Sequence, residues 1–200
     1  MTTPFEYPAT VHIHRHGPSG YADYESYRPW LRDEFAFRCV YCLRREAWGP
    51  RRAQYHIDHI APVAHSPELT TTYDNLRYAC STCNSKKRDQ LLPDPLVTLL
   101  SGAVAVDENG QVTGQTPEAK RLILLLELDG DEETTYRWLM IESIRLAEEF
   151  NQDLHRQLLG FPADLPDLSG LRPPGGNTRS EGVGESHAAR RERAELPATY

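Results

Sequence analysis

Two pairs of cysteines enclose the part of this chain that is richest in groups able to do chemistry. Cys39 and Cys42 form one C-x-x-C pair, Cys80 and Cys83 form a second, and the chain has no other cysteine. Two such pairs can place four thiolates around one ion, which is the tetrahedral ligand set of structural zinc. Two disulfides or unrelated buried thiols are the alternatives. The chain does not open with a basic start and an apolar run, so we expect no signal peptide, and a reducing cytoplasm favours zinc.

The segment between the two pairs is long enough to hold a site of its own. It has 37 residues between Cys42 and Cys80, whereas an ordinary zinc ribbon leaves about 15–20. Its pattern predicts a strand over 55–60, a polar loop over 62–73, a second strand over 76–79 and a short helix over 84–91. The expected order is therefore strand, loop, strand, helix.

Polar motifs at the ends of these elements resemble those of a known family. The motifs are Asp58-His59-Ile60 followed by Pro62, then Asp74-Asn75-Leu76, then Cys83-Asn84 followed by Lys86-Lys87. About 50 of the 200 residues resemble the HNH (ββα-metal) endonucleases, in the subgroup whose finger is braced by four cysteines. Many members have histidine where this chain has Asn84, so it is similar to the H-N-N variant, of the stand-alone bacterial or phage type.

The resemblance implies a role for each polar residue. His59 would be the general base, Asp58 and Asn84 would hold a catalytic divalent cation, and Asn75 would fix the loop. The reaction requires such groups, because phosphodiester hydrolysis needs an activated water molecule and stabilisation of the negative charge on the phosphoryl oxygens. A carboxylate and a carboxamide oxygen favour Mg²⁺ or Mn²⁺ as the catalytic ion, beside the structural Zn²⁺.

Each of these residues also has a simpler explanation. Strand alternation places Asp58 and His59 on opposite faces, so bringing both to one ion needs a twist or bulge before the loop. Taken singly, Asp58 could cap a turn, His59 could be a half-buried histidine, Asn75 could form an Asx-turn, and Asn84 could cap the following helix. Their joint occurrence inside the cysteine clamp favours the catalytic interpretation. His56 is a weaker candidate that would contact phosphate or support the site from outside.

Charge favours a nucleic-acid substrate only locally. The chain as a whole carries a formal charge of −7, which argues against a protein that coats nucleic acid nonspecifically. Residues 38–90 have nine basic and five acidic side chains, a balance of +4. The expected backbone contacts are Arg44 and Arg45 with Arg51 and Arg52, and Lys86, Lys87 and Arg88. A solvated charged face is the alternative, particularly for Arg51 and Arg52. DNA is the expected substrate and RNA is not excluded.

The rest of the chain indicates an α+β protein of modest size. We expect an N-terminal strand and aromatic extension over 1–37 that packs on the finger, the nuclease domain over 38–92, a hairpin and acidic helices over 93–168, and a disordered tail over 169–200. Asn109-Gly110 predicts a hairpin turn. Two helices follow, over 118–128 and 132–159, and no run is long enough to span a membrane.

Alternate histidines mark the N-terminal extension. His12, His14 and His16 would share one face of a strand, as a metal or phosphate site or as an ordinary exposed face. No acidic or cysteine partner is close to them in the sequence, so the exposed face is the expectation.

The helical portion is acidic and allows two interpretations. Residues 118–167 contain twelve acids and five bases, so this region is not expected to contact DNA. A packing scaffold is the default, and a docking surface for a partner protein is the alternative. The hairpin and helices loosely resemble those of stand-alone bacterial HNH proteins, some of which act beside an ATPase in anti-phage defence.

These observations predict a metal-dependent HNH endonuclease acting on DNA in the cytoplasm. One alternative is a zinc-finger module that binds nucleic acid without catalysis. Another is an RNase or toxin that uses the same site.

Overall fold

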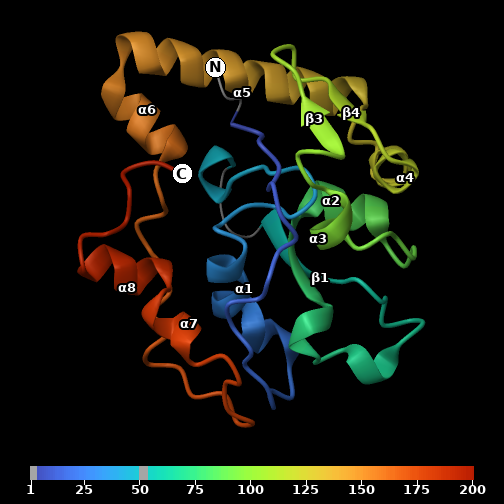
Figure 1. Ribbon diagram of the computed structural model, residues 1–200, viewed down its shortest axis with the longest axis vertical. Helices are drawn as coiled ribbons and strands as arrows, with labels where there is room; N and C mark the ends of the chain where they lie inside the picture. Colours follow the sequence, from blue (N-terminus) through green and yellow to red (C-terminus); the bar gives the residue numbers. More distant parts are fainter. Residues whose placement is uncertain (1–3, 50–53) are drawn as a thin grey trace.

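The computed structural model describes residues 4–49 and 54–200 as a mixed α+β protein, which confirms the expected fold class (Figure 1). The helices are α1 (Arg28–Glu34), α2 (Ser81–Lys87), α3 (Pro95–Thr98), α4 (Pro117–Leu125), α5 (Asp131–Phe150), α6 (Gln152–Leu159), α7 (Glu181–Gly184) and α8 (His187–Glu192). The strands form two antiparallel pairs, β1 (Tyr55–His59) with β2 (Leu76–Cys80) and β3 (Val104–Val106) with β4 (Val112–Gly114). Short 3-10 turns include η1 (Tyr24–Tyr27), η2 (Glu46–Trp48), η4 (Pro67–Leu69) and η5 (Tyr73–Asn75).

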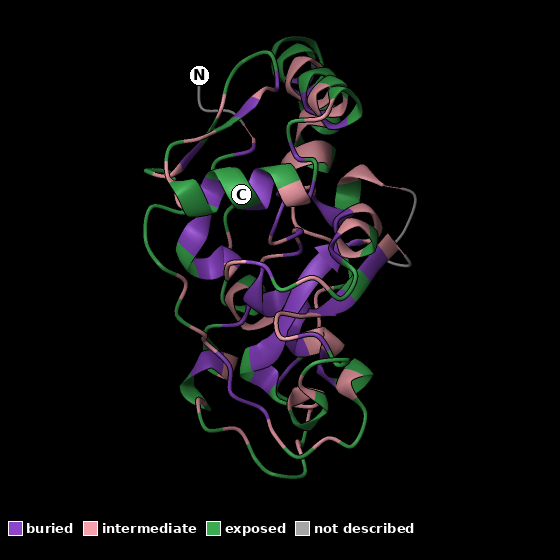
Figure 2. Ribbon diagram, turned by 90° about the vertical axis from the view of Figure 1, so that its right-hand side faces the viewer, coloured by how far each residue is buried: buried purple, intermediate pink, exposed green. Residues whose placement is uncertain are grey.

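The first strand pair and α2 have the predicted order of strand, loop, strand and helix. β1 pairs with β2 in an unbroken register, from Tyr55 opposite Cys80 to His59 opposite Leu76. Cys80 is extended and is the N-cap of α2, so the helix begins directly where β2 ends. All residues of β2 are buried, and Figure 2 shows the buried residues concentrated in the middle of the molecule. β2 therefore lies inside the protein, whereas β1 leaves His56 exposed and His59 half-buried.

The N-terminal extension covers one side of this hairpin. α1 has Pro29 in its first turn, which suits a helix start, and it packs on β2 with Trp30 and Leu31 fully buried. Before α1, the Tyr7 hydroxyl donates a hydrogen bond to the Tyr41 carbonyl at 2.7 Å. This bond ties the start of the chain to the turn that holds the first cysteine pair.

The predicted hairpin after the finger is β3 and β4, with a longer turn than expected. The Asp107 N–H donates to the Gln111 carbonyl at 3.0 Å, so the chain reverses over three residues, 108–110, rather than over the predicted two. Gly110 has φ of 79°, the left-handed conformation that closes a three-residue turn. A Cβ there would lie 2.5 Å from the Thr134 carbonyl oxygen of α5, so glycine is also required for packing.

The long helix predicted over 132–159 is two helices. α5 ends at Phe150, and the Asn151 side chain accepts a hydrogen bond from the Leu154 N–H to start α6. Asparagine is a strong N-cap, so local capping outweighs the continuous apolar periodicity. Arg137 of α5 is buried and donates to the carbonyls of Gly110 and Leu128, both at 2.6 Å, which fixes α5 against the hairpin. No described helix combines the length and apolar composition that crossing a bilayer requires.

The C-terminal segment 169–200 differs from the disorder expected from its composition. α7 and α8 lie beside α1 (Figure 1), and Asn177 forms a β-bridge with Pro18. His187 is 6% exposed and its Nδ1 lies 2.8 Å from the Asp33 carboxylate. Tyr200 stacks on Phe161 with ring centroids 4.2 Å apart. A few specific anchors therefore hold a polar segment that lacks an apolar core of its own.

Candidate functional site

The four cysteines gather into one buried cluster beside the β1–β2 hairpin. Their Sγ atoms all lie within 4.8 Å of one another, and those of Cys42 and Cys80 are 3.7 Å apart. Thiolates on a tetrahedral zinc, with Zn–S bonds of about 2.3 Å, are about 3.8 Å from each other. The separation therefore fits a shared zinc ion.

Backbone geometry explains how each pair meets. After Cys39 the chain turns through Leu43, whose φ is 59°, and Cys39 N–H bonds the Arg44 carbonyl at 2.9 Å. The second pair spans the junction of β2 and α2. Hydrogen bonds from the three neighbouring thiols lower the pKa of Cys80, and hydrogen bonds within the same cluster raise the pKa of Cys42 and Cys83. Without an ion the cluster therefore favours a thiolate at Cys80, which is the form that binds zinc.

His59 ends β1 with its imidazole fixed by the loop. Its Nε2 lies 2.9 Å from the Thr70 carbonyl oxygen, which can only accept, so Nε2 carries the proton and Nδ1 is the basic nitrogen. The Tyr24 ring packs edge-on against the imidazole at 4.9 Å between centroids. Among the described residues, none has a hydrogen bond to Nδ1. His59 is therefore oriented, half-buried and able to take up a proton.

Asp58 points to the opposite side of β1 and is buried. One carboxylate oxygen accepts from the Tyr41 hydroxyl at 2.5 Å, and the other pairs with the Lys87 ammonium at 3.0 Å. The expected twist or bulge is absent, because β1 pairs regularly with β2 through His59. As it stands, Asp58 does not fit a ligand of the catalytic ion, since the Lys87 cation already neutralises it. The sequence did not reveal Tyr41 as its partner, although Tyr41 lies between the first two cysteines.

Asn75 holds the loop between the strands. Its carboxamide oxygen accepts from the Ala61 N–H at 2.8 Å, and its amide nitrogen donates to the carbonyls of Ala61 and Leu69 at 3.1 and 3.3 Å. The side chain is 8% exposed. It bridges the two ends of the loop whose Thr70 carbonyl orients His59.

Asn84 lies in the first half of α2 and is half-exposed. Among the described residues, its carboxamide has no hydrogen-bond partner, although its backbone carbonyl accepts from Arg88 N–H at 3.0 Å. The side chain is therefore free to offer an oxygen to a hard cation. Asn84 could bind a cation as it stands, whereas Asp58 would first have to give up its pair with Lys87.

The expected basic contacts separate into buried and surface groups. Arg45 is 3% exposed and donates to the Leu159 carbonyl, and Arg44 lies 3.9 Å from the Tyr136 ring and 3.4 Å from the Glu133 carboxylate. Lys87 is 1% exposed in its pair with Asp58. Arg45 and Lys87 are therefore buried, and Arg44 is partly exposed but engaged by Tyr136 and Glu133. Each would have to leave these partners to contact a phosphate.

The surface group is smaller. Arg88 is exposed, and Lys86 is half-exposed in a pair with Glu127 at 3.3 Å, so both remain near Asn84 and open to solvent. His56 is exposed on β1. Arg51 and Arg52 lie outside the described residues.

Comparison with known proteins agrees with this arrangement. Residues 39–90 match the family model of the HNH endonucleases. The match covers both cysteine pairs, both strands of the hairpin and α2, while the remainder of the chain lies outside it. No curated protein matches the chain. Because HNH enzymes are metal-dependent nucleases, the match and the cysteine cluster together indicate a metal-binding domain of the nuclease type in this part of the chain.

Proposed function

We propose that the chain is a metal-dependent HNH endonuclease that hydrolyses phosphodiester bonds in DNA. The family match over residues 39–90 supports the reaction class. The single observation that carries the catalytic assignment is the His59 imidazole, held at Nε2 by the Thr70 carbonyl with Nδ1 left basic. A lone histidine in a strand does not need this arrangement, whereas a general base does.

In the proposed reaction, Nδ1 of His59 accepts a proton from a water molecule as the water oxygen attacks phosphorus. The bond from phosphorus to the 3′ oxygen breaks, and the leaving oxygen is protonated from solvent. Thr70 and Tyr24 keep the imidazole in one orientation while Nδ1 gains and loses its proton. Asn75 supports this indirectly by closing the loop that contains Thr70.

We assign the catalytic cation, Mg²⁺ or Mn²⁺, to Asn84 and, once its pair with Lys87 opens, to Asp58. Such an ion would stabilise the charge on the phosphoryl oxygens and on the leaving oxygen. Asn84 needs no rearrangement, because its carboxamide has no partner among the described residues. Asp58 needs Lys87 to move, since the ammonium and the cation would compete for the same oxygen.

The test is cleavage by the purified full chain with Mg²⁺ or Mn²⁺. Single-stranded DNA, duplex DNA and RNA are incubated side by side with the native protein, the His59→Ala variant and the His155→Ala variant. We expect DNA cleavage that falls by about 10²–10⁴-fold in His59→Ala and is retained in His155→Ala, because His155 lies on α6, outside the residues that match the nuclease family. Equal cleavage by the native protein and His59→Ala would reject the mechanism.

One observation favours the alternative of a binding module without catalysis. The Asp58 carboxylate is fully engaged by Tyr41 and Lys87, which suits a structural role. That alternative predicts nucleic-acid binding without metal-dependent cleavage. An RNase or toxin predicts cleavage of RNA in place of DNA, so the same set of substrates separates all three functions.

A protein partner, such as an ATPase in anti-phage defence, stays a prediction. Its support is the acidic helical region, where α5 exposes large apolar side chains, namely Trp138, Leu139, Leu146 and Phe150. Other α5 side chains are buried, so the helix is also a scaffold.

A further inference from the structure

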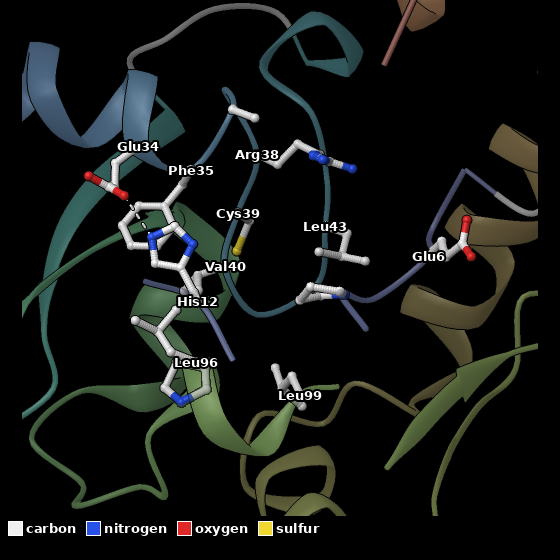
Figure 3. A pocket seen from close by; sticks show the side chains of 13 residues that line it. Glu6, His12, Glu34, Phe35, Arg38, Cys39, Val40, Leu43, Leu96 and Leu99 are labelled. Atoms are coloured by element: carbon white, nitrogen blue, oxygen red, sulfur yellow. Dashed lines mark hydrogen bonds and ion pairs between the residues drawn. The ribbon is translucent and has the colours of Figure 1, made fainter. Parts of the chain in front are cut away.

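A second cluster of metal-binding side chains lies outside the nuclease site. His12 and His14 belong to the extended N-terminal segment, and Glu34 is the last residue of α1. His12 Nε2 lies 2.7 Å and His14 Nδ1 lies 3.9 Å from the same carboxylate oxygen, Glu34 Oε1. Figure 3 shows His12 directed at Glu34, beside Phe35 on the wall of a cavity. Two imidazoles and a carboxylate therefore converge on one point.

The carboxylate is held in place from its other side. Its Oε2 accepts from the His16 N–H at 3.0 Å and from the Tyr73 hydroxyl at 3.2 Å, while Arg15 N–H donates to Oε1 at 2.9 Å. The side chain is fully buried, so an oriented carboxylate faces the two imidazoles.

One imidazole nitrogen of this cluster is buried without a hydrogen-bond partner among the described residues. This atom is His14 Nδ1, and 3.9 Å to Glu34 Oε1 is too long for a hydrogen bond. The Tyr73 ring packs against His14 at 5.6 Å between centroids, which keeps the imidazole in place. A buried polar atom without a partner needs an explanation, and an ion bound between His14 and Glu34 would supply one.

We propose that His12 Nε2, His14 Nδ1 and Glu34 Oε1 bind one Zn²⁺ ion. Ligand atoms on a tetrahedral zinc with bonds of about 2.0–2.1 Å are about 3.4 Å apart. The two distances to Glu34 bracket that value, and all three ligand atoms lie within 4.8 Å of one another. Three protein ligands leave one position open, and His12 and Glu34 border a cavity of about 200 Å³ that could supply water (Figure 3).

This site is separate from the cysteine cluster and reaches the nuclease loop. Tyr73, which bonds Glu34, starts η5 and is two residues from Asn75. His16 does not take part, because it pairs with Asp33 at 2.8 Å. An ion here would join the N-terminal segment, α1 and the loop that orients His59. The proposal does not depend on nuclease activity.

The test is the zinc content of the full chain. The native protein, His14→Ala and the control His65→Ala, whose side chain is exposed, are equilibrated with Zn²⁺, passed through a desalting column and measured by elemental analysis. We expect His14→Ala to hold one zinc ion fewer than the native protein and His65→Ala to hold the same number. We also expect added Zn²⁺ to raise the melting temperature of the native protein and of His65→Ala, but not of His14→Ala.

A second variant guards against misfolding. The side chain of His12 is 23% exposed, so His12→Ala is the milder change, and circular dichroism checks the fold of each variant. Equal zinc content in the native protein and both folded variants would overturn the proposal and leave His12 and Glu34 as a plain hydrogen-bonded pair. An equal loss in His65→Ala would also overturn it, as adventitious surface binding.

Discussion

At the candidate nuclease site, the role of each side chain depends on the residues that it contacts. Lys87 and Asp58 form a buried ion pair, and Lys87 also donates to the His59 carbonyl at 2.6 Å. Lys87 therefore joins α2 to the end of β1, where both catalytic candidates lie. The pair stabilises the apo protein and blocks an oxygen that the proposed cation would need.

Replacing Lys87 tests this competition. Lys87→Met leaves the Asp58 carboxylate buried without its cation, which should lower the free energy of unfolding by about 3–5 kcal/mol. If Asp58 is a metal ligand, millimolar Mg²⁺ should restore part of that loss. Denaturant unfolding with and without Mg²⁺ measures both effects. Lys86→Met is the matched control, since its pair with Glu127 is at the surface and should contribute about 0–1 kcal/mol. A Mg²⁺ effect that is the same in both variants would argue against Asp58 as a ligand.

Asn75 gives a second prediction at the residue scale. Asn75→Ala removes three hydrogen bonds and leaves the Ala61 N–H without its partner, so the unfolding free energy should fall by about 1–3 kcal/mol. Cleavage should fall as well, because the Thr70 carbonyl loses its fixed place. Asn75→Asp keeps the acceptor but not the donors, so we expect an intermediate effect. Unchanged activity in a folded Asn75→Ala protein would separate the loop from catalysis.

At the scale of elements, the four-cysteine cluster predicts that the β1–β2 hairpin and α2 depend on a bound zinc ion. Zinc binding to sites of this kind is worth about 10–16 kcal/mol, which is comparable with the whole stability of a domain, about 5–15 kcal/mol. Removal of zinc by a strong chelator, or by Cys42→Ser, should therefore unfold the hairpin and α2. Amide hydrogen exchange should show loss of protection across residues 39–90, and added zinc should restore it in the chelated native protein. A metal-free protein with native protection would contradict a structural zinc.

The elements themselves were largely predictable, and their long-range contacts were not. Local signals predicted β1, β2 and the presence of a helix after them, because alternation and the cysteine spacing act over a few residues. That helix, α2, begins at Ser81 rather than at the predicted residue 84, and Asn84 does not cap it. At Gly110 a positive φ closes a three-residue turn where the Asn-Gly pair predicted two residues. At Asn151 the side-chain cap outweighs the apolar periodicity and divides the predicted helix in two. The pairing of Asp58 with Tyr41, and of His12 with Glu34, joins residues 17 and 22 positions apart. No periodicity reports such contacts, so neither the Tyr41 partner of Asp58 nor the Glu34 partner of His12 was predicted.

At the scale of the whole molecule, the C-terminal segment closes over the N-terminal extension. Tyr200 lies between Phe161 and the guanidinium of Arg45, which is 4.1 Å from its ring centroid. The segment therefore covers arginines of the finger that would otherwise face solvent.

Alkaline titration should report this contact. Burial raises the pKa of Tyr200 to about 12, above the usual value of about 10. The folded state then holds the proton more tightly than the unfolded state, so its contribution is complete below pH 10 and is lost as the pH rises toward 12. We expect a loss of about 2 kcal/mol over that range. Other groups titrate there too, so the measured quantity is the difference between the native protein and Tyr200→Phe. Parallel stability curves for the two proteins would contradict a buried phenol.

Asp33 of α1 is a second and stronger anchor of the C-terminal segment than Tyr200. It joins α1 to His16 in the N-terminal extension and to His187 in the C-terminal segment. Its Oδ1 accepts from the His187 N–H at 2.7 Å and pairs with the His187 ring at 2.8 Å, while its Oδ2 pairs with His16. His187→Ala removes only the ring contact, so we expect the unfolding free energy to fall by about 1.5–3 kcal/mol. Limited proteolysis should then cut residues 169–200 faster, while the finger stays protected. The control variant His155→Ala changes a half-exposed histidine of α6. We expect the protease to cut it at the same rate as the native protein. A His187→Ala protein as resistant as the native one would mean that the segment is held by its other contacts, including the backbone N–H bond from residue 187 to Asp33.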